Sequence, residues 1–191
     1  MDLEMAHAAL GLVRFSRVPR HGLTAAEISV IRALLWSAFG DGEDAMAESD
    51  WEHALGGAHF LLELDGEVVA YASVAERRLE IDGRGLRTGY VEAVATAVTR
   101  QRQGFGSLLM REVNAYIRDR FELGALGTGE HAFYERLGWV TWRGPTSVRA
   151  PEGSRRTPDE DGYILVLATP ASPPLDLAAP MSCDWRLGDA W

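Results

Sequence analysis

Apolar side chains along the chain follow two periodicities, one typical of helices and one typical of strands. Between Ile28 and Ala38, apolar residues recur every three or four positions, which places them on one face of a helix. Thr24 precedes this pattern, and its side chain can cap the first turn. The pattern therefore predicts a helix from Ala25 to about Phe39.

Shorter stretches predict three further helices. One covers residues 50–55, with Asp50 as its expected N-cap. Another follows residues 101–106, and a third covers residues 131–137 and ends at Gly138, because glycine favours the conformation found just after a helix. The second of these helices has apolar residues at helical spacing that are expected to face inward, namely Leu108, Leu109, Val113, Tyr116 and Ile117.

Most of the remaining apolar runs predict strands. Asp65-Gly66 lies between two of them and is a strong signal for a tight hairpin turn, and a Gly-Arg-Gly turn is expected at 83–85. Residues 89–97 read GYVEAVATA, a largely apolar run that is typical of a central buried strand. The predicted strands are residues 11–16, 59–64, 67–77, 79–82, 86–90, 89–97, 123–128, 139–142 and 163–167.

Strands with interspersed helices predict an α/β (α+β) fold with one mixed central sheet. A length of 191 residues suits a single domain, which we expect to span residues 1–191. The tail, residues 170–191, is rich in proline at first and then in aromatic and acidic residues. We expect this tail to fold back on the domain toward the substrate site.

Composition limits the classes of partner. A formal net charge of -9 repels nucleic acid and anionic membranes, and suits a cationic small molecule. The sequence shows no signal peptide and no apolar run long enough to span a bilayer. Cys183 is the only cysteine, so the chain cannot form an internal disulfide, and a metal site would need more Cys or His at ligand spacing. We expect a cytoplasmic protein without a metal.

The sharpest chemical signal is the segment Gln101–Gly106, QRQGFG, between the central strand and an amphipathic helix. Glycines at the start of a helix let backbone N–H groups converge on an anion, and the helix dipole assists them. Arg102 adds a positive charge beside them. A pyrophosphate is the expected occupant, and a plain glycine-containing turn is the alternative.

This segment resembles the pyrophosphate loop of the GCN5-related N-acetyltransferase (GNAT) superfamily, Gln/Arg-x-x-Gly-x-Gly/Ala. Gln101, Gly104 and Gly106 fill its three places. LGALGT followed by HAFYERLGW is similar to the later strand and helix of the superfamily. The resemblance implies acetyl-coenzyme A as the co-substrate and a sheet in which two central parallel strands separate.

Longer blocks resemble the aminoglycoside 2'-N-acetyltransferases within that superfamily. They span most of the chain from near residue 30 and read DWEHALGGAH, GYVEAVA, WRGPTSVRAP, RTPDEDG and CDWRLGDAW. The activity implied is transfer of an acetyl group to the 2'-amine of an aminoglycoside, which confers antibiotic resistance. Relatives form dimers, so a homodimer is expected.

The resemblance also implies roles for individual residues. By the resemblance, the main chain of Val94, Ala95 and Thr96 pairs with the pantetheine arm, and the N–H of Val94 stabilises the oxyanion. The alternative is a plain core strand, which their side chains could form in either case. The pyrophosphate is held by the segment Gln101, Arg102, Gln103, Gly104, Phe105 and Gly106.

Two side chains are expected to move protons. Glu92 lies in an otherwise buried run, where an unpaired carboxylate is costly. The resemblance makes it the group that deprotonates the amine through water, and the alternative is a Glu that faces solvent. Tyr134 is implied to protonate the leaving thiolate, and the alternative is a tyrosine that only packs in the core.

Acidic groups should recognise a polycationic substrate, although any one of them could be an ordinary solvated loop charge. Trp185 and Trp191 either line the pocket or anchor the tail, with the core favoured for Trp185. An early loop longer than in relatives leaves Asp41 and Asp44 unresolved, and Gly127 stands where relatives carry serines. The substrate-binding candidates are Asp41, Asp44, Glu92, Ala93, Gly127, Asp159, Glu160, Asp189 and Trp191.

Other functions stay open at this stage. The enzyme could acetylate another polyamine, a cell-wall amino sugar or a protein N-terminus. A non-catalytic acyl-coenzyme A sensor would not need both Glu92 and Tyr134. Sequestration of a drug by acidic residues alone would leave no acetylated product.

Overall fold

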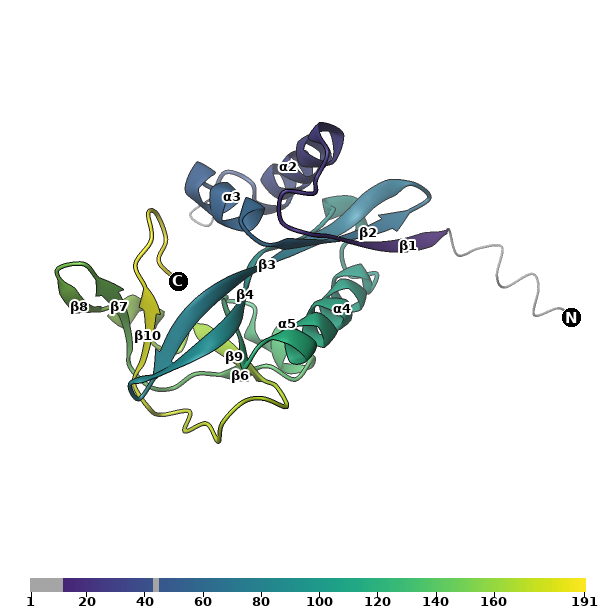
Figure 1. Ribbon diagram of the computed structural model, residues 1–191. Coiled ribbons are helices and arrows are strands. Elements are labelled where there is room, and N and C mark those ends of the chain that lie inside the picture. Colours follow the sequence, from purple (N-terminus) through teal and green to yellow (C-terminus); the bar gives the residue numbers. More distant parts are fainter. Residues whose placement is uncertain (1–11, 43–44) are drawn as a thin grey trace, which may run out of the picture. The chain divides into compact units, whose positions relative to one another are not determined.

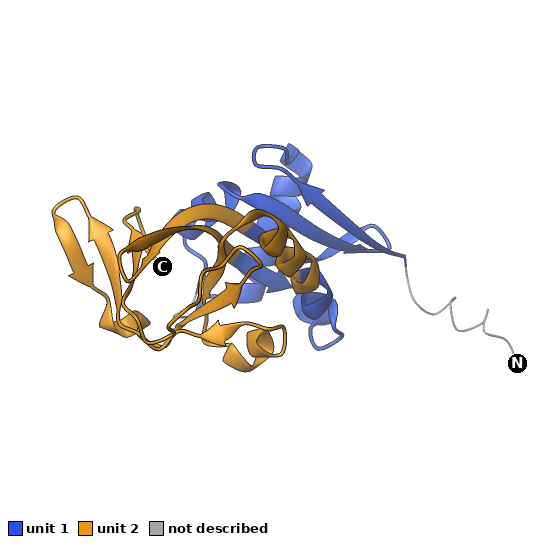
Figure 2. Cartoon of the chain, turned by 60° about the horizontal axis from the view of Figure 1, so that its bottom comes forward, with its two compact units in different colours: residues 1–73, 93–109 blue, residues 74–92, 110–191 orange. Residues whose placement is uncertain are grey.

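The structure is a computed structural model of the 191-residue chain, and it describes residues 12–42 and 45–191. Two compact units are distinguished (Figure 2): residues 1–73 with 93–109 form unit 1, and residues 74–92 with 110–191 form unit 2. Three elements contribute residues to both units: β3 (Glu67–Ile81), β4 (Arg84–Thr96) and α4 (Phe105–Arg120). The expected single domain stays a prediction.

Helix α2 of unit 1 spans Ala25–Phe39, as predicted. Its N-terminus is a capping box, in which the Glu27 N–H donates to Thr24 Oγ1 over 3.2 Å and the Thr24 N–H donates to Glu27 Oε2 over 2.7 Å. The second helix, α3 (Glu48–Leu55), begins earlier than predicted. Asp50 is not its N-cap but lies in its first turn, where it accepts a hydrogen bond from the Ala47 N–H at 2.9 Å.

The strands of unit 1 begin with an antiparallel pair, β1 (Val13–Val18) and β2 (Ala58–Leu64). β2 then pairs with β3 across the predicted Asp65-Gly66 turn, where both residues have positive φ, 53° and 85°. Helices α2 and α3 bury an apolar cluster against these strands, and its most buried members are Ile31, Leu34, Leu35, Trp51, Leu61, Tyr71 and Ala95.

His59 is a titratable group inside unit 1. It is 1% exposed, and its Nδ1 lies 2.8 Å from the Tyr71 hydroxyl. Burial lowers the pKa of His59 to about 4, and the charge of His21 acts in the same direction.

This shift predicts acid sensitivity. The unfolded chain binds a proton at His59 near pH 6.5 but the folded chain only near pH 4, so stability falls as pH drops through this window, by about 3 kcal/mol. Urea unfolding at pH 7.5 and pH 4.5 measures the loss. The variant His59→Gln should lose less between the two pH values, and an equal loss in both proteins would contradict the prediction.

Unit 2 contains most of the chain's sheet, with the strand order β6-β9-β5-β4-β3-β10-β7-β8 (Figure 1). Strands β5, β6 and β9 lie close to the predicted positions. β7, β8 and β10 were missed, because they lie in segments interpreted as loop or tail. The bounds are β5 Leu123–Gly127, β6 Val140–Thr141, β7 Thr146–Ala150, β8 Gly153–Arg156, β9 Ile164–Ala168 and β10 Met181–Asp184.

Two pairs of predicted strands are each a single strand in the structure. Residues 67–77 and 79–81 belong to the single strand β3, and residues 86–96, predicted as the overlapping ranges 86–90 and 89–97, belong to β4. The turn between β3 and β4 is formed by Asp82-Gly83, so that Arg84 and Gly85 already lie in β4.

The helical parts of the second half of the chain largely follow the prediction. α4 buries Leu109, Val113 and Ile117, but Leu108 is 39% exposed and was wrongly expected to face inward. α5 (His131–Glu135) is shorter than predicted. Two 3-10 turns, η1 (Val98–Arg100) and η2 (Pro158–Glu160), complete the elements.

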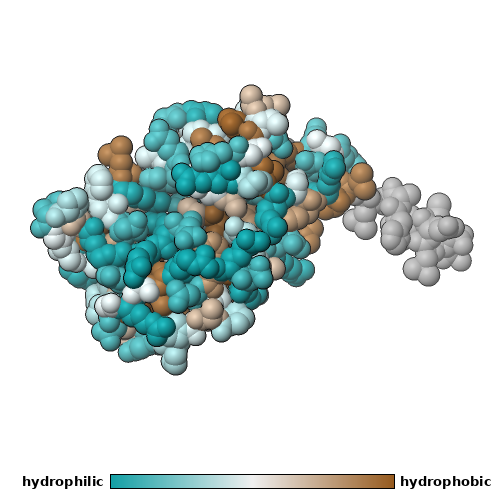
Figure 3. Space-filling view, viewed as in Figure 1, coloured by the Kyte–Doolittle hydropathy of each residue, from teal (hydrophilic) through white to brown (hydrophobic). Residues whose placement is uncertain are grey.

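The tail folds onto the sheet of unit 2. Whether it reaches a substrate site stays a prediction. β10 pairs antiparallel with β3 and parallel with β7. Trp142 Nε1 donates to the main-chain oxygen of Ala179 over 3.0 Å, and Trp191 is buried in the same core as Trp142. The face shown in Figure 3 is mainly hydrophilic, with hydrophobic side chains in small separate patches.

β4 and β5 form the parallel pair on which the predicted site depends. Within unit 2 they pair at three positions, from Thr88↔Leu123 to Tyr90↔Ala125. Both strands continue, and β5 stays paired with β9 as far as Gly127↔Ile164. Among the described residues of unit 2, pairing between these parallel strands therefore ends just before Glu92.

Candidate active site

The Glu92 side chain is buried near the end of the unit 2 part of β4. It is 8% exposed, so the alternative of a solvent-facing glutamate is wrong. The Arg186 guanidinium, from the tail, donates to both carboxylate oxygens: Nη1 to Oε1 over 2.6 Å and Nη2 to Oε2 over 3.3 Å. This bidentate ion pair supplies the compensation that a buried carboxylate requires.

Arg186 also makes hydrogen bonds within the C-terminal loop, residues 185–191. Its Nε donates to the Asp189 main-chain oxygen over 2.7 Å and Nη2 donates to that of Trp191 over 3.2 Å. The Trp191 N–H donates to Asp189 Oδ1 over 3.0 Å. Burial acts to lower the pKa of Arg186, but the charge of Glu92 and the hydrogen bonds to it prevail, and the pKa is raised.

Tyr90 lies two positions before Glu92 and is 2% exposed. Its ring faces two guanidinium groups, that of Arg77 at 4.8 Å and that of Arg186 at 5.7 Å from the ring centre. Burial and then the charge of Glu92 raise the pKa of Tyr90. The Tyr90 hydroxyl and Arg77 Nη1 are buried without a hydrogen-bond partner among the described residues.

Two of the predicted substrate-binding carboxylates, Asp159 and Asp189, act electrostatically on a third, Glu160, within unit 2. The pKa of Glu160 is raised by its burial and then by the charges of Asp189 and Asp159. Asp189 also interacts electrostatically with Arg186. Carboxylates gathered in this way repel one another, and a cationic ligand would relieve the repulsion.

The two tail tryptophans behave differently from each other. Trp191 is 5% exposed and its Nε1 donates to Thr157 Oγ1 over 3.0 Å, so its ring anchors the tail. Trp185 is 49% exposed, and the expectation that it lies in the core is wrong.

Tyr134 lies on α5 and is 7% exposed. Its ring makes edge contacts with the rings of Phe133 and Trp139, at centre distances of 4.8 and 6.2 Å. Burial, and then the charge of Glu130, raise the pKa of Tyr134 above its usual value. The phenol therefore keeps its proton throughout the neutral range, which is the state that a general acid needs.

The predicted cofactor segments lie in unit 1. Arg102 and Gly104 both have positive φ, 60° and 91°, and a Cβ added to Gly104 would find no atom within 4 Å. The Leu108 N–H donates to the Gly104 main-chain oxygen over 3.0 Å, and the N–H groups just before it have no acceptor within the helix. Gln101 Nε2 donates to the Thr96 main-chain oxygen over 3.4 Å and so links the loop to β4. An open cradle at the N-terminus of α4 fits a pyrophosphate.

The remaining predicted site residues that the structure describes are divided between the two units. Asp41 is exposed in a turn of unit 1, and Asp44 lies outside the described residues. Ala93 is half-buried on β4, and Val94 and Thr96 are also half-buried, whereas Ala95 is 5% exposed. Gly127 ends β5, and a Cβ there would lie 3.6 Å from the Tyr90 hydroxyl.

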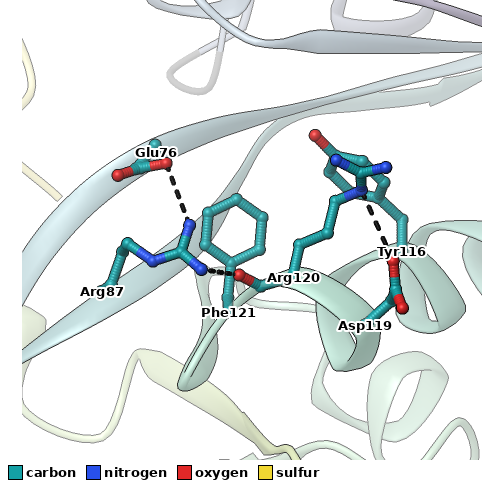
Figure 4. Close-up of a pocket in the computed structure, with 6 residues that line it drawn as sticks. All are labelled: Glu76, Arg87, Tyr116, Asp119, Arg120 and Phe121. Carbon is teal, nitrogen blue, oxygen red and sulfur yellow. Dashed lines mark hydrogen bonds and ion pairs between the residues drawn. The ribbon is translucent and has the colours of Figure 1, made fainter.

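A surface pocket elsewhere in unit 2 contains none of the predicted site residues (Figure 4). Its arginines already have partners: Arg87 Nη1 lies 3.3 Å from Glu76 and its guanidinium 5.0 Å from the Phe121 ring, and Arg120 lies 3.6 Å from Asp119. The lining residues are Glu76, Arg87, Tyr116, Asp119, Arg120 and Phe121.

A family model described as an acetyltransferase (GNAT) domain matches residues 21–141. The chain belongs to the GNAT acetyltransferase family. It is 42% identical over 153 residues to an aminoglycoside 2'-N-acetyltransferase of Mycolicibacterium fortuitum, with 78% of each chain covered.

Solved GNAT structures share the fold of this acetyltransferase. An Escherichia coli family member in complex with CoA has a TM-score of 0.61 at 17% identity, with 94% of each chain covered. A Brucella melitensis member in complex with acetyl-CoA has a TM-score of 0.59 at 18% identity, with 88% of this chain and 94% of the other covered. A longer Kribbella flavida member has a TM-score of 0.58 at 22% identity, and the match covers 72% of this chain but only 35% of that one.

Family membership confirms the predicted α/β fold, an acyltransferase activity and acetyl-CoA as co-substrate. Within the described residues, no helix is long and apolar enough to cross a membrane. Sequence reasoning overlooked Arg186 as a site residue. A buried glutamate demands a counter-ion, and this could have directed attention to the arginine of CDWRLGDAW.

Proposed function

We propose that this GNAT acetyltransferase moves the acetyl group of acetyl-CoA to the 2'-amine of aminoglycosides. The observation that carries the proposal is the buried Glu92 carboxylate in the same unit as Glu160 and the two carboxylates that act on it, Asp159 and Asp189. Such a group suits an amine-bearing polycation. The name of the relative from Mycolicibacterium fortuitum supports the particular amine and substrate class.

The proposed chemistry is direct transfer. The ammonium loses a proton through water to Glu92, and the resulting amine nitrogen attacks the thioester carbonyl carbon. The Val94 N–H stabilises the oxyanion that develops on the carbonyl oxygen. The C–S bond then breaks, and Tyr134 protonates the departing thiolate. Cys183 is fully buried, and burial raises the pKa of its thiol to about 11, so a covalent cysteine intermediate is not part of the proposal.

Binding of acetyl-CoA is assigned to unit 1. The main chain of Val94, Ala95 and Thr96 is proposed to pair with the pantetheine arm, and the loop from Gln101 to Gly106 to hold the pyrophosphate. The positive φ of Gly104 and the open space at its Cβ position support the loop assignment.

Mass spectrometry after incubation with acetyl-CoA tests the substrate class. Kanamycin B and gentamicin carry a 2'-amine and should each gain one acetyl group, whereas amikacin carries no 2'-amine and should remain unmodified. Acetylation of other amines with none on these drugs would favour the other amine substrates. Binding of acetyl-CoA with no product from any amine would favour a sensor.

A homodimer, a cytoplasmic location and a role in antibiotic resistance stay predictions. Light scattering measures the oligomeric state. Susceptibility to kanamycin B of cells that express the wild-type protein or its Glu92→Gln variant tests resistance. Survival with the variant, without acetylated drug, would indicate sequestration instead.

A further inference from the structure

We propose that Arg186 is a positioning residue of the acetyl transfer, whose guanidinium holds Glu92 as an oriented anion and fixes Asp189 on the C-terminal loop. The inference rests on the proposed role of Glu92. It extends that role to a residue 94 positions away in the chain, on a loop that sequence patterns alone did not connect to β4.

The Arg186 guanidinium binds both oxygens of the Glu92 carboxylate. A carboxylate offers about two acceptor positions on each oxygen. Arg186 occupies one on Oε1 and one on Oε2, at 2.6 and 3.3 Å, and leaves the others for water or an amine. Because both oxygens are held by a planar fork, the carboxylate cannot rotate freely.

The charges near Tyr90 and Glu92 come from two parts of unit 2. The charged groups that act on Tyr90 are Glu92 itself, Arg77 from β3, and Arg186 and Asp189 from the C-terminal loop. Arg77 directs its Nη2 to Asp184, 2.9 Å from the main-chain oxygen and 3.3 Å from Oδ1. Among the described residues, Arg186 is therefore the cation that contacts Glu92, while Asp189 adds negative charge beside it.

Arg186 also contacts the main chain of the C-terminal loop. Two further N–H groups of Arg186 donate to the main-chain oxygens of Asp189 and Trp191. One side chain thus fixes both the proposed base and the loop that bears a proposed substrate-binding carboxylate. A lysine could supply the charge but not this fork.

The test is the pH profile of kcat/KM for kanamycin B acetylation in four proteins: wild type, Arg186→Gln, Arg186→Lys and Arg149→Gln. Removing the positive charge from a buried carboxylate favours its protonated form. In Arg186→Gln we expect the acid limb to move to higher pH, and kcat/KM at pH 7 to fall by roughly 10- to 100-fold. In Arg186→Lys the limb should return toward its wild-type position, with kcat/KM reduced at every pH because the fork is lost.

Arg149→Gln is the matched control. Arg149 also anchors the tail, since its Nη1 donates to the Ser182 main-chain oxygen over 2.8 Å and its Nη2 donates to that of Arg78 over 2.6 Å. Its carboxylate partner is Glu80 rather than Glu92. This variant should leave the acid limb in place. Circular dichroism and acetyl-CoA affinity, which is assigned to unit 1, report whether each variant is folded.

An unmoved acid limb in a folded Arg186→Gln, or equal losses in Arg186→Gln and Arg149→Gln at every pH, would overturn the proposal. If Arg186→Gln does not fold, Arg186→Lys decides, and a wild-type kcat/KM in that variant overturns it. A failure of the proposed function would give a different result from a failure of this inference. In that case Glu92→Gln would be fully active on the drug, or the wild type would show no acetylation.

Discussion

Glu92→Gln is expected to lower kcat/KM for kanamycin B at pH 7 by about 10²- to 10⁴-fold, the range that a general base contributes. The amide keeps an oxygen that can accept from Arg186, so the buried pair loses its charge but not all of its hydrogen bonding. At alkaline pH the amine is already free and needs no base. The deficit should therefore shrink as pH rises, which a pH series of initial rates measures.

Glu80→Gln provides the control for that experiment. Glu80 also belongs to unit 2 and pairs with an arginine, Arg149, at 3.4 Å, but it lies outside the proposed site. Its replacement should leave the pH profile unchanged. If the deficit of Glu92→Gln is the same at every pH, Glu92 does not act as the base, and wild-type activity would remove it from the mechanism altogether.

Gly104→Val is expected to weaken acetyl-CoA binding by roughly 10- to 100-fold, equivalent to losing one hydrogen bond to a charged group. Gly104 has a φ of 91°, a conformation that a β-branched residue rarely adopts. Beyond Gly104 and its chain neighbours, no protein atom lies within 4 Å of its Cβ position, so the valine would project into the open space proposed to hold the pyrophosphate. Isothermal titration calorimetry with CoA gives the dissociation constant.

Gly66→Val separates backbone strain from loss of the ligand cradle. Gly66 is also in unit 1, has a φ of 85° and has no atom within 4 Å of its Cβ position, but it lies in the hairpin turn between β2 and β3. Both variants should lose roughly 1–3 kcal/mol of stability. Only Gly104→Val should bind CoA more weakly, and an unchanged dissociation constant would refute the pyrophosphate loop.

Local chemistry explains which parts of the fold were predictable. The bounds of α2 follow from the Thr24 cap, and the β2–β3 turn follows from Asp65-Gly66, because each depends on residues only a few positions apart. The strand β10 was missed for the opposite reason, because its partner β3 lies about 100 residues away and its own four residues, MSCD, are too few to predict a strand. β7 and β8 form a local hairpin, but β8, GSRR, has no buried residue and no apolar pattern that could predict a strand.

Burial was predictable for runs of residues but not for every side chain within them. Leu108 follows the helical spacing of α4 and is nevertheless exposed, because periodicity does not show where the neighbouring elements end. Trp185 and Trp191 are both aromatic residues of the tail, yet only Trp191 is buried. The Trp191 Nε1 donates a hydrogen bond to Thr157 Oγ1, whereas the Trp185 side chain is exposed next to Arg186 in the chain.

The sequence by itself determined the GNAT resemblance, the glycine-containing loop before α4 and the presence of an acidic residue within a buried strand. These features reside in short stretches of chain, where backbone preference and hydrophobic pattern are local properties. Tertiary structure alone decided that Arg186 is the partner of Glu92 and that the C-terminal loop closes around it. A buried charge requires a counter-charge, but which of the 19 basic residues supplies it depends on how the folded tail lies against β4.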